Sequence, residues 1–275
     1  MTIHHLDCAG MCPAGGRLLL GSGRLFTGRF VSHCLLIESD DGLVLVDTGL
    51  GTADVADPRR LGLAFRAAMR PELAPDRTAL TQIRALGLDP RDVRDIVLTH
   101  LDLDHAGGLA DFPHARVHVL ADELRAAEAP PTRGERVRYR PVQWAHHPHW
   151  VEYERPQEEW FGFQAVRLTM PAATPEILLL PMPGHTRGHC AVAVRSGEGW
   201  LLHCGDAFFS PADIHPGRPP RPPALSVVQR LLATDNSARR HNRLRLRELN
   251  RAQPDLIRLF CAHDPHEFHR LARTG

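Results

Sequence analysis

Four short apolar segments of this 275-residue chain end in loops that carry histidine or aspartate. Such segments are typical of buried strands, and loops at strand ends on a rigid sheet are common places for metal sites. The pattern therefore constrains the chain to a fold that gathers several strand ends around one polar site. The segments are residues 96–98, followed by THLDLDHAGG; 177–180, followed by His185; 200–203, followed by Asp206; and 257–261, followed by His263.

Other segments indicate that strands and helices alternate along the chain. Residues 30–37 and 43–46 flank an Asp-Gly turn, which predicts a hairpin. Residues 76–86 predict a helix capped by Asp76, because apolar residues recur three apart within them. Residues 235–251 predict a basic helix.

Because strands fall in every third of the chain with helices between them, we expect one α/β domain over residues 1–275. Three segments lack a regular pattern and are rich in proline, glycine or tryptophan. We expect them to form irregular loops that shape a pocket. They are residues 50–75, 129–165 and 211–235.

The composition limits the range of partners. Lys plus Arg is 33 and Asp plus Glu is 32, a net charge of +1, so we expect no nucleic-acid partner and no membrane partner. No apolar stretch approaches the roughly 20 residues of a membrane span, and no secretion signal is visible. Six scattered cysteines do not form a dense disulfide framework, which predicts a cytoplasmic protein. Its expected partner is a small-molecule substrate; the oligomeric state stays open.

The segment THLDLDHAGG places four potential metal ligands within six residues, in a chain that has 18 histidines. In an extended stretch, the alternating residues His100, Asp102 and Asp104 project together. A bend between the adjacent Asp104 and His105 would send these two side chains to different metals. The following glycines let the backbone turn tightly beside the site.

Together, these motifs resemble the metallo-β-lactamase superfamily, whose signature is HxHxDH, then a distant His, a bridging Asp and a last His. The resemblance extends from Asp47 to His263 and implies an αββα sandwich, with two mixed sheets face to face and helices outside. It implies catalytic roles for Asp104 and Asp206, and an orienting role for Asp47 beside the site. The implied ligands are His100, Asp102 and His185 for a first metal, Asp104, His105 and His263 for a second, and Asp206 for both.

Asp102 departs from the usual motif, which has histidine at this position. The resemblance implies two divalent metal ions, with zinc the first choice, but a carboxylate is a harder ligand that suits Mn or Fe. Two divalent ions, three aspartates and one hydroxide would sum to zero charge, one less than in the usual pattern. We therefore expect weaker Lewis acidity. The alternative is that Asp102 binds no metal and that the site holds one ion.

The resemblance implies a hydrolase that cleaves an ester or lactone with a hydroxide bridging the metals. The lactonase branch is favoured, because HLDLDHAGGL, PGHTRGH and HDPHEF are most similar to it. Phe209 departs from that branch, since it replaces a tyrosine that can assist the substrate carbonyl, and phenylalanine donates no hydrogen bond. The alternatives are a glyoxalase II-like thioesterase, a diiron redox protein and a metal-bound sensor with little turnover.

Other polar residues carry weaker expectations. His189 is expected to pack or hydrogen-bond beside the site. Cys8 and Cys12 are expected to be loop cysteines, because no second pair completes a metal site. Residues 144–150, WAHHPHW, either line a substrate pocket or pack on the sandwich. Residues 239–251 predict a solvated basic face on their helix.

Overall fold

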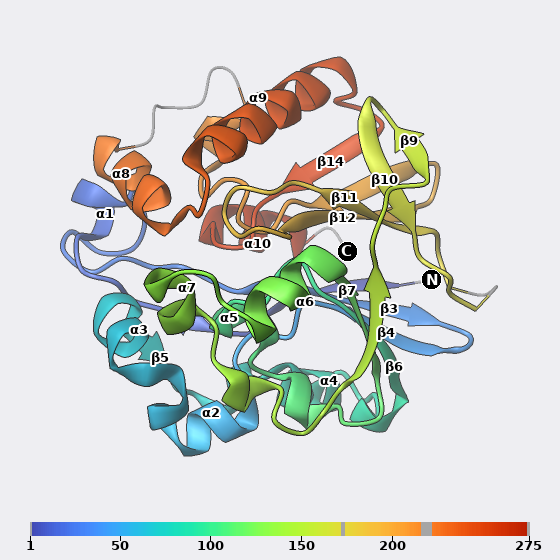
Figure 1. Ribbon diagram of the computed structural model, residues 1–275, viewed down its shortest axis with the longest axis horizontal. Helices are drawn as coiled ribbons and strands as arrows, with labels where there is room; N and C mark the ends of the chain where they lie inside the picture. The colour runs from blue at the N-terminus through green and yellow to red at the C-terminus, as the bar shows by residue number, and fades with distance from the viewer. Residues whose placement is uncertain (1, 172–173, 216–221, 274–275) are drawn as a thin grey trace.

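The computed structural model describes residues 2–171, 174–215 and 222–273, and these residues form two six-stranded sheets packed face to face (Figure 1). Helices lie on the outer sides of the sheets. The αββα sandwich that the sequence predicted is therefore confirmed. Among the described residues, no helix combines the length and the apolar character needed to cross a membrane.

The strands divide into the two large sheets and one small one. The first sheet contains β1 (Ile3–Asp7), β3 (His33–Ser39), β4 (Gly42–Val46), β6 (Val93–Val97), β7 (Arg116–Leu120) and β8 (His149–Tyr153). The second contains β9 (Glu158–Trp160), β10 (Phe163–Arg167), β11 (Ile177–Pro181), β12 (Cys190–Ser196), β13 (Gly199–His203) and β14 (Ile257–Phe260). The small sheet pairs β2 (Gly10–Met11) with β5 (Pro71–Glu72).

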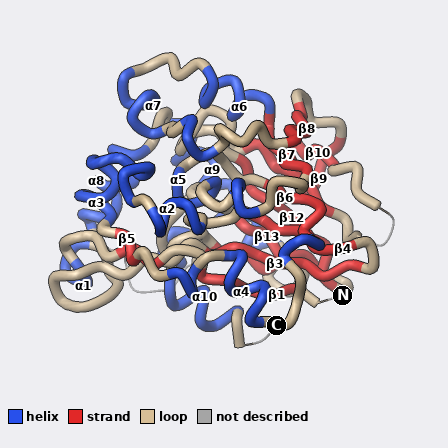
Figure 2. Tube along the Cα trace, turned by 90° about the horizontal axis from the view of Figure 1, so that it is seen from below, coloured by secondary structure: helices blue, strands red, loops and turns tan. Residues whose placement is uncertain are grey.

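The helices are short apart from one near the end of the chain. They are α1 (Gly16–Leu19), α2 (Thr52–Ala56), α3 (Gly62–Met69), α4 (Ala79–Ala85), α5 (Leu103–Ala106), α6 (Ala121–Glu128), α7 (Arg133–Arg138), α8 (Pro223–Leu232), α9 (Asn236–Ala252) and α10 (Pro265–Leu271). Figure 2 shows the strands of the two large sheets gathered on one side of the molecule, with α3, α8 and the short strand β5 on the other.

The strand order brings the predicted loops together. The first sheet has the order β1-β3-β4-β6-β7-β8, and β4, β6, β7 and β8 run parallel. The second has the order β14-β13-β12-β11-β10-β9, with β13 and β14 parallel. Because parallel strands end at the same edge of a sheet, the loops after β4 and β6 are neighbours, as are those after β13 and β14.

Alternation along the strands gives the sandwich three apolar layers. In β3, for example, Leu35 points into the layer between the sheets, whereas Leu36 points outward. The outer side of the first sheet packs against α4 and α6, including Ile83 of α4. The outer side of the second sheet packs against α9 through Leu246. These layers fix the strand ends that carry the site.

Several elements that the sequence predicted are present in the structure, and one predicted helix begins at a different residue. The hairpin corresponds to β3 and β4, and the basic helix corresponds to α9, which Asp235 caps. The helix predicted over residues 76–86 begins later, at Ala79. Its cap is Thr78, whose Oγ1 accepts the backbone N–H of Thr81, because the preceding residues form a 3-10 turn.

The three segments predicted to be irregular contain regular elements. Residues 50–75 hold α2 and α3, residues 129–165 hold α7 and three strands, and residues 211–235 hold α8. These helices have ten residues or fewer, too short for a clear helical period to show in the sequence. Part of the proline-rich stretch, residues 216–221, lies outside the described residues.

Candidate metal centre

The first group of possible ligands lies where the loop after β6 meets loops of the second sheet. His100, Asp102, His185 and Asp206 each present one ligand atom, and these atoms lie within 4.8 Å of one another. Nε2 of His185 lies 3.0 Å from Oδ2 of Asp102, and Nε2 of His100 lies 3.4 Å from the same oxygen. Imidazole and carboxylate atoms gathered in this way can hold a divalent transition-metal ion.

The second group contains Asp104, His105 and His263, whose ligand atoms also lie within 4.8 Å of one another. Nε2 of His263 lies 3.5 Å from Oδ2 of Asp104. The expectation that residues 100, 102 and 104 project together is wrong, because α5 begins at Leu103 and turns Asp104 to the second group. The expectation that a bend separates Asp104 from His105 is also wrong, since the two adjacent side chains belong to the same group.

Asp206 lies between the two groups. Its Oδ1 is 3.0 Å from Nε2 of His263 and 3.5 Å from Nε2 of His105. Its Oδ2 is 3.2 Å from Nε2 of His185 and 3.9 Å from Nε2 of His100. Oδ2 also lies 3.2 Å from Nε2 of His263, so Oδ1 faces the second group and Oδ2 contacts both groups. The carboxylate of Asp206 therefore lies against both ligand groups, as a bridging ligand must.

His189 forms a hydrogen bond with the loop that carries Asp206. The backbone N–H of Asp206 donates to Nε2 of His189 at 2.9 Å, and Nδ1 of His189 donates to the carbonyl of Met182 at 3.1 Å. Gly205 has φ +49°, and a Cβ there would lie 2.6 Å from Nε2 of His189. The histidine lies beside the site, as expected, and only glycine fits between it and Asp206.

Asp47, at the end of β4, fixes the orientation of His105. Its Oδ2 accepts from Nδ1 of His105 at 2.8 Å, and from the hydroxyl of Thr99 at 2.7 Å. Its Oδ1 accepts the backbone N–H of Thr99 at 2.8 Å. These bonds leave Nε2 of His105 facing Asp206, as expected for a carboxylate that orients a ligand.

Glu123 of α6 joins two of the ligand loops, and sequence reasoning did not identify it. Its buried carboxylate accepts the backbone N–H of Leu101 at 2.9 Å and that of Gly188 at 3.0 Å. The hydroxyl of Tyr139 donates to it at 3.1 Å. One side chain thus connects the loop of His100 to the loop of His185.

Both groups contain buried polar atoms that have no hydrogen-bond partner among the described residues. Nε2 of His100, Nε2 of His105 and Oδ1 of Asp206 make no hydrogen bond within the part of the chain that the structure describes. Buried polar atoms without partners cost free energy, so such atoms call for an ion or a ligand. Four imidazoles and three carboxylates are a donor set that fits divalent metal ions.

The charges of the site favour a cation. Burial opposes ionisation of Asp206, but His263, His185 and His105 outweigh it and hold the pKa of this carboxyl well below its usual range. Burial also opposes protonation of His263, but Asp206 and Asp104 raise its pKa to about 9. Asp206 is therefore anionic at neutral pH, and its field favours a positive charge beside it.

Arg138 of α7 lies beside Asp102 and was missed from the sequence. Its Nε is 3.4 Å from Oδ1 of Asp102. Burial opposes ionisation of Asp102, but Arg138 and then His100 keep its pKa well below the ordinary value. The expected neutral charge sum omitted this cation. No local pattern could have found it, because the pairing joins residues that are far apart in the sequence.

A cavity of ≈ 530 Å³ opens onto the two ligand groups. Three helices supply apolar walls: α3 through Phe65 and Met69, α7 through Val137, and α8 through Leu231. Phe209 also lines the cavity. Its base contains five of the seven predicted ligands, which are Asp102, Asp104, His185, Asp206 and His263.

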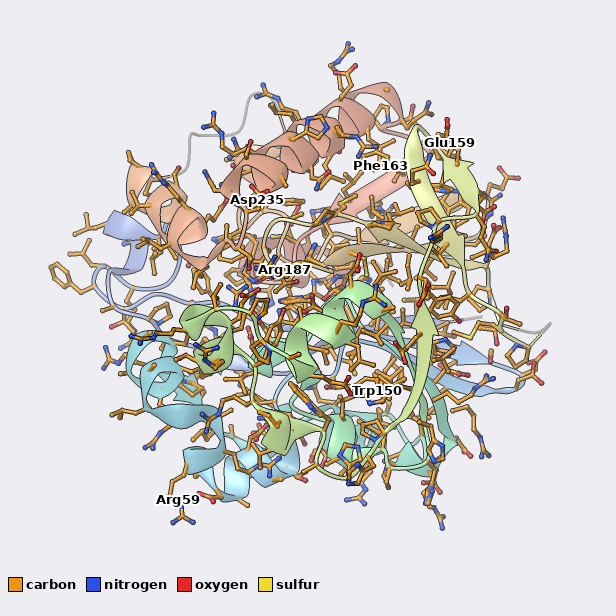
Figure 3. All side chains as sticks on the ribbon, in the orientation of Figure 1. Arg59, Trp150, Glu159, Phe163, Arg187 and Asp235 are labelled. Atoms are coloured by element: carbon orange, nitrogen blue, oxygen red, sulfur yellow. The ribbon has the colours of Figure 1, made fainter. Side chains whose placement is uncertain are left out.

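Other residues singled out in the sequence lie elsewhere. Trp144 and Trp150 pack against the outer side of the first sheet, so residues 144–150 pack on the sandwich (Figure 3 labels Trp150). Cys8 is buried, and Sγ of Cys12 donates to Glu72 at 3.5 Å. Neither cysteine belongs to a ligand group found among the described residues.

The basic face of α9 is only partly solvated. Arg239 is buried, and Nη1 of Arg243 lies 3.0 Å from Oδ1 of Asp213. The guanidinium of Arg245 lies 4.0 Å from the ring centroid of Phe163, which Figure 3 labels. The solvated face is therefore confirmed only in part: residues such as Arg240 and Arg247 are exposed, whereas Arg239, Arg243 and Arg245 have partners within the protein.

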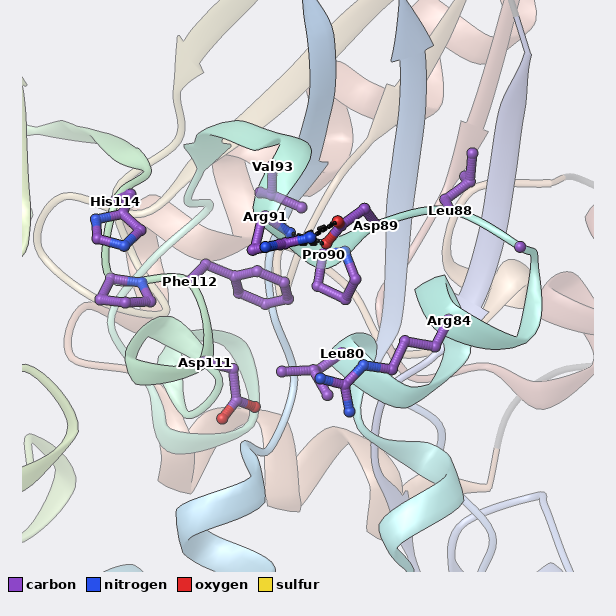
Figure 4. Close-up of a pocket in the computed structure, with 12 residues that line it drawn as sticks. Leu80, Arg84, Leu88, Asp89, Pro90, Arg91, Val93, Asp111, Phe112 and His114 are labelled. Carbon is purple, nitrogen blue, oxygen red and sulfur yellow. Dashed lines mark hydrogen bonds and ion pairs between the residues drawn. The ribbon is translucent and has the colours of Figure 1, made fainter.

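A second cavity, of ≈ 590 Å³, lies beside α4 and is separate from the ligand groups (Figure 4). Leu80 and Phe112 line it, and Arg91 forms an ion pair with Asp89 at 2.6 Å. None of the seven predicted ligands lines it. Its volume is close to that of the cavity at the candidate metal centre, so volume alone does not identify the functional site.

Comparison with known proteins identifies the family. The model of the metallo-β-lactamase superfamily matches residues 27–257. The chain belongs to this superfamily. It is 46% identical over 274 residues to a probable metallo-hydrolase of Mycobacterium tuberculosis, which covers 99% of this chain and 83% of that protein. It is 28% identical over 185 residues to an N-acyl homoserine lactonase of Rhizobium johnstonii, covering 63% of this chain and 64% of that one.

Solved structures of the superfamily share the fold of this chain. An N-acyl homoserine lactone hydrolase with the product N-hexanoyl-L-homoserine at its catalytic metal centre has a TM-score of 0.70 at 20% identity, covering 98% of this chain and 95% of that one. A dizinc quorum-quenching lactonase has a TM-score of 0.57 at 17% identity, covering 96% and 85%. At these identities the likeness establishes the fold.

Proposed function

We propose that this protein is a dinuclear metallohydrolase that cleaves an ester or a lactone with an apolar acyl group. The observation that carries the proposal is Asp206, whose two oxygens face two ligand groups at the base of an apolar cavity. Zinc is the first choice of metal, and Mn or Fe suits the carboxylate of Asp102. We assign His100, Asp102 and His185 to one ion, Asp104, His105 and His263 to the other, and Asp206 to both.

Two divalent ions in these groups would supply an activated water and polarise the substrate carbonyl. The chain's own residues keep the ligands in place: Asp47 orients His105, and His189 fixes the loop of Asp206. Asp104 and Asp206 are the catalytic carboxylates of the proposal, since both belong to the ligand groups and line the cavity that would hold the substrate. Phe209 offers the substrate a ring and no hydrogen bond.

The cavity favours an apolar acyl group over an anionic one. Two arginines line it, but each is already paired: Nε of Arg187 donates to Glu135 at 2.6 Å, and Arg138 lies against Asp102. A glutathione thioester, the substrate class of the glyoxalase II-like alternative, would need free positive charge. The lactonases among the relatives support a lactone or ester as the scissile group.

The test is a hydrolysis panel on metal-loaded protein, with lactones, aryl esters and thioesters of four to ten acyl carbons. We expect kcat/KM to rise with chain length. A buried CH₂ contributes up to about 0.8 kcal/mol, or about fourfold per carbon while the chain still fits. Asp206→Ala, which removes the shared ligand, should lose both ions and all turnover.

The matched control is Asp213→Ala, which removes a buried carboxylate that pairs with Arg243 instead of facing the ligand groups. It should keep its metal content. Turnover that survives in Asp206→Ala or in chelator-treated protein would overturn the proposal. So would a preference for short, charged thioesters.

A further inference from the structure

Arg138 makes an unusual set of contacts for a pocket residue. Its Nε lies 3.4 Å from Oδ1 of Asp102, its Nη1 donates to the carbonyl of His185 at 2.6 Å, and its Nη2 donates to the carbonyl of Leu232. The side chain is 14% exposed. Because all three of its nitrogens have partners, this guanidinium is held in place and is not free to bind a substrate anion.

The two oxygens of Asp102 have separate surroundings. Oδ2 faces the first ligand group, 3.0 Å from Nε2 of His185 and 3.4 Å from Nε2 of His100. Oδ1 faces Arg138. The contact with Arg138 is an ion pair, since Oδ1 makes no hydrogen bond among the described residues. A carboxylate can turn about its Cβ–Cγ bond, so a fixed cation on one side favours the orientation in which the other oxygen faces a metal ion.

Charge supports the same role. With an imidazole at position 102, two carboxylates would face the ligand groups; Asp102 makes three. The guanidinium of Arg138 is always charged, so it cancels the extra negative charge of Asp102. The net charge of the site is then the one that two carboxylates alone would give. A buried charge without a partner is strongly unfavourable, so the carboxylate at position 102 needs this cation.

We propose that Arg138 is the positioning residue that lets a carboxylate replace an imidazole in the first ligand group. This inference rests on the proposed function, because it concerns the same metal centre. It predicts that Arg138 and Asp102 are coupled: the arginine is needed when residue 102 is aspartate and is dispensable when it is histidine.

The test is a double-mutant cycle of the wild type, Arg138→Met, Asp102→His and the double variant. Zn²⁺ dissociation constants are measured by competition with a chromophoric chelator, and the visible absorption of Co²⁺-loaded protein reports the ligand geometry. We expect Arg138→Met to weaken one of two Zn²⁺ sites by about 10- to 100-fold, the range for residues that orient ligands. In the Asp102→His background, the same change should alter affinity by less than about threefold.

Arg136→Met is the matched control, because Arg136 lies on the same helix and donates to the carbonyl of Pro130, away from the ligands. It should leave Zn²⁺ affinity unchanged. If Arg138→Met does not fold, Arg138→Lys provides the same comparison in both backgrounds, since lysine keeps the charge but not the three-way contact.

Equal losses of Zn²⁺ affinity in the wild-type and Asp102→His backgrounds would mean that Arg138 acts only as a general structural contact. That result would overturn the inference. Unchanged affinity in the Asp102 background would overturn it as well. Both results leave the proposed function standing, provided that the wild type binds two ions and hydrolyses its substrates. A wild type that binds no ion in the first group overturns both.

Discussion

Asp47 has a strained backbone conformation, and in that conformation its carboxylate orients the predicted ligand His105. Its φ is +56°, in the left-handed region that residues other than glycine rarely adopt. Its carboxylate accepts three hydrogen bonds, two from Thr99 and one from His105. The strain costs on the order of 1 kcal/mol, and the three charge-assisted bonds offset it.

Asp47→Asn tests this role. Asparagine tolerates the positive φ, but its amide nitrogen cannot accept the hydrogen bonds that Oδ1 or Oδ2 accepts now. We expect Zn²⁺ affinity at the second ligand group to fall by about 10- to 100-fold while the protein stays folded. Chelator competition and circular dichroism measure the two effects.

Asp95→Asn is the control for that substitution. Asp95 is a buried carboxylate of β6 that accepts from Nε2 of His118 at 2.8 Å, so the change breaks a similar bond away from the ligand groups. It should lower stability and leave metal affinity as it was. Equal metal affinity in Asp47→Asn and the wild type would show that His105 needs no orienting partner.

Sequence reasoning named the seven side chains that the structure brings together, because each lies within a few residues of a strand end. His263, for example, follows the apolar strand β14, and its loop must then lie beside the loop after β13. Arg138 and Glu123 could not be found in this way. Their partners are set by how α6 and α7 pack across the loops, which no local pattern records.

At the scale of elements, the packing of α6 on the loop of His185 depends on Gly188. A Cβ at Gly188 would lie 2.1 Å from the backbone nitrogen of Glu123. We expect Gly188→Ala to force the loop and the helix apart, lowering the free energy of unfolding by about 1–3 kcal/mol and weakening the first ligand group. Urea denaturation and Zn²⁺ titration measure these changes.

Gly134→Ala supplies the comparison, since this glycine lies in α7 and a Cβ there would meet no atom closer than 3.9 Å. It should be neutral or should stabilise the helix by up to about 1 kcal/mol. A Gly188→Ala protein as stable as Gly134→Ala would mean that the loop can move away from α6 without cost.

The elements that the sequence predicted are those with buried, continuous apolar runs, such as β11 and β13. The elements that it missed lie at sheet edges or around the cavity. β8 is a half-exposed edge strand, HWVEY, in which polar and aromatic residues alternate without a clear apolar face. Helix α3 has no fully buried residue, because Phe65 and Met69 line the cavity on one side and pack only partly against small apolar clusters on the other.

At the scale of the whole molecule, Glu267 makes stability depend on pH. Burial in α10 raises its pKa from 4.5 to about 7. Between these two values the folded protein keeps a proton that the unfolded chain has lost, so stability falls as the pH rises through this window. The loss reaches about 3 kcal/mol above pH 7. Glu267→Gln cannot titrate and should remove this slope.

The measurement is the free energy of unfolding from urea melts at pH 4.5 to 8, as the difference between wild type and variant. Glu159→Gln changes an exposed carboxylate of β9 that Figure 3 labels; it keeps Glu267, so its pH dependence should match that of the wild type. A parallel pH dependence in wild type and Glu267→Gln would place the titrating group elsewhere.

The predicted ligands come from both halves of the sandwich: His100 to His105 follow a strand of the first sheet, whereas His185, Asp206 and His263 follow strands of the second. Ions held between them would act as cross-links that the unfolded chain lacks. An ion at a hundred times its dissociation constant adds about 2.7 kcal/mol to the free energy of unfolding. The lifetime of the protein would then depend on the concentration of free metal ions. A molecule without bound metal would unfold more readily, and proteases would degrade it sooner.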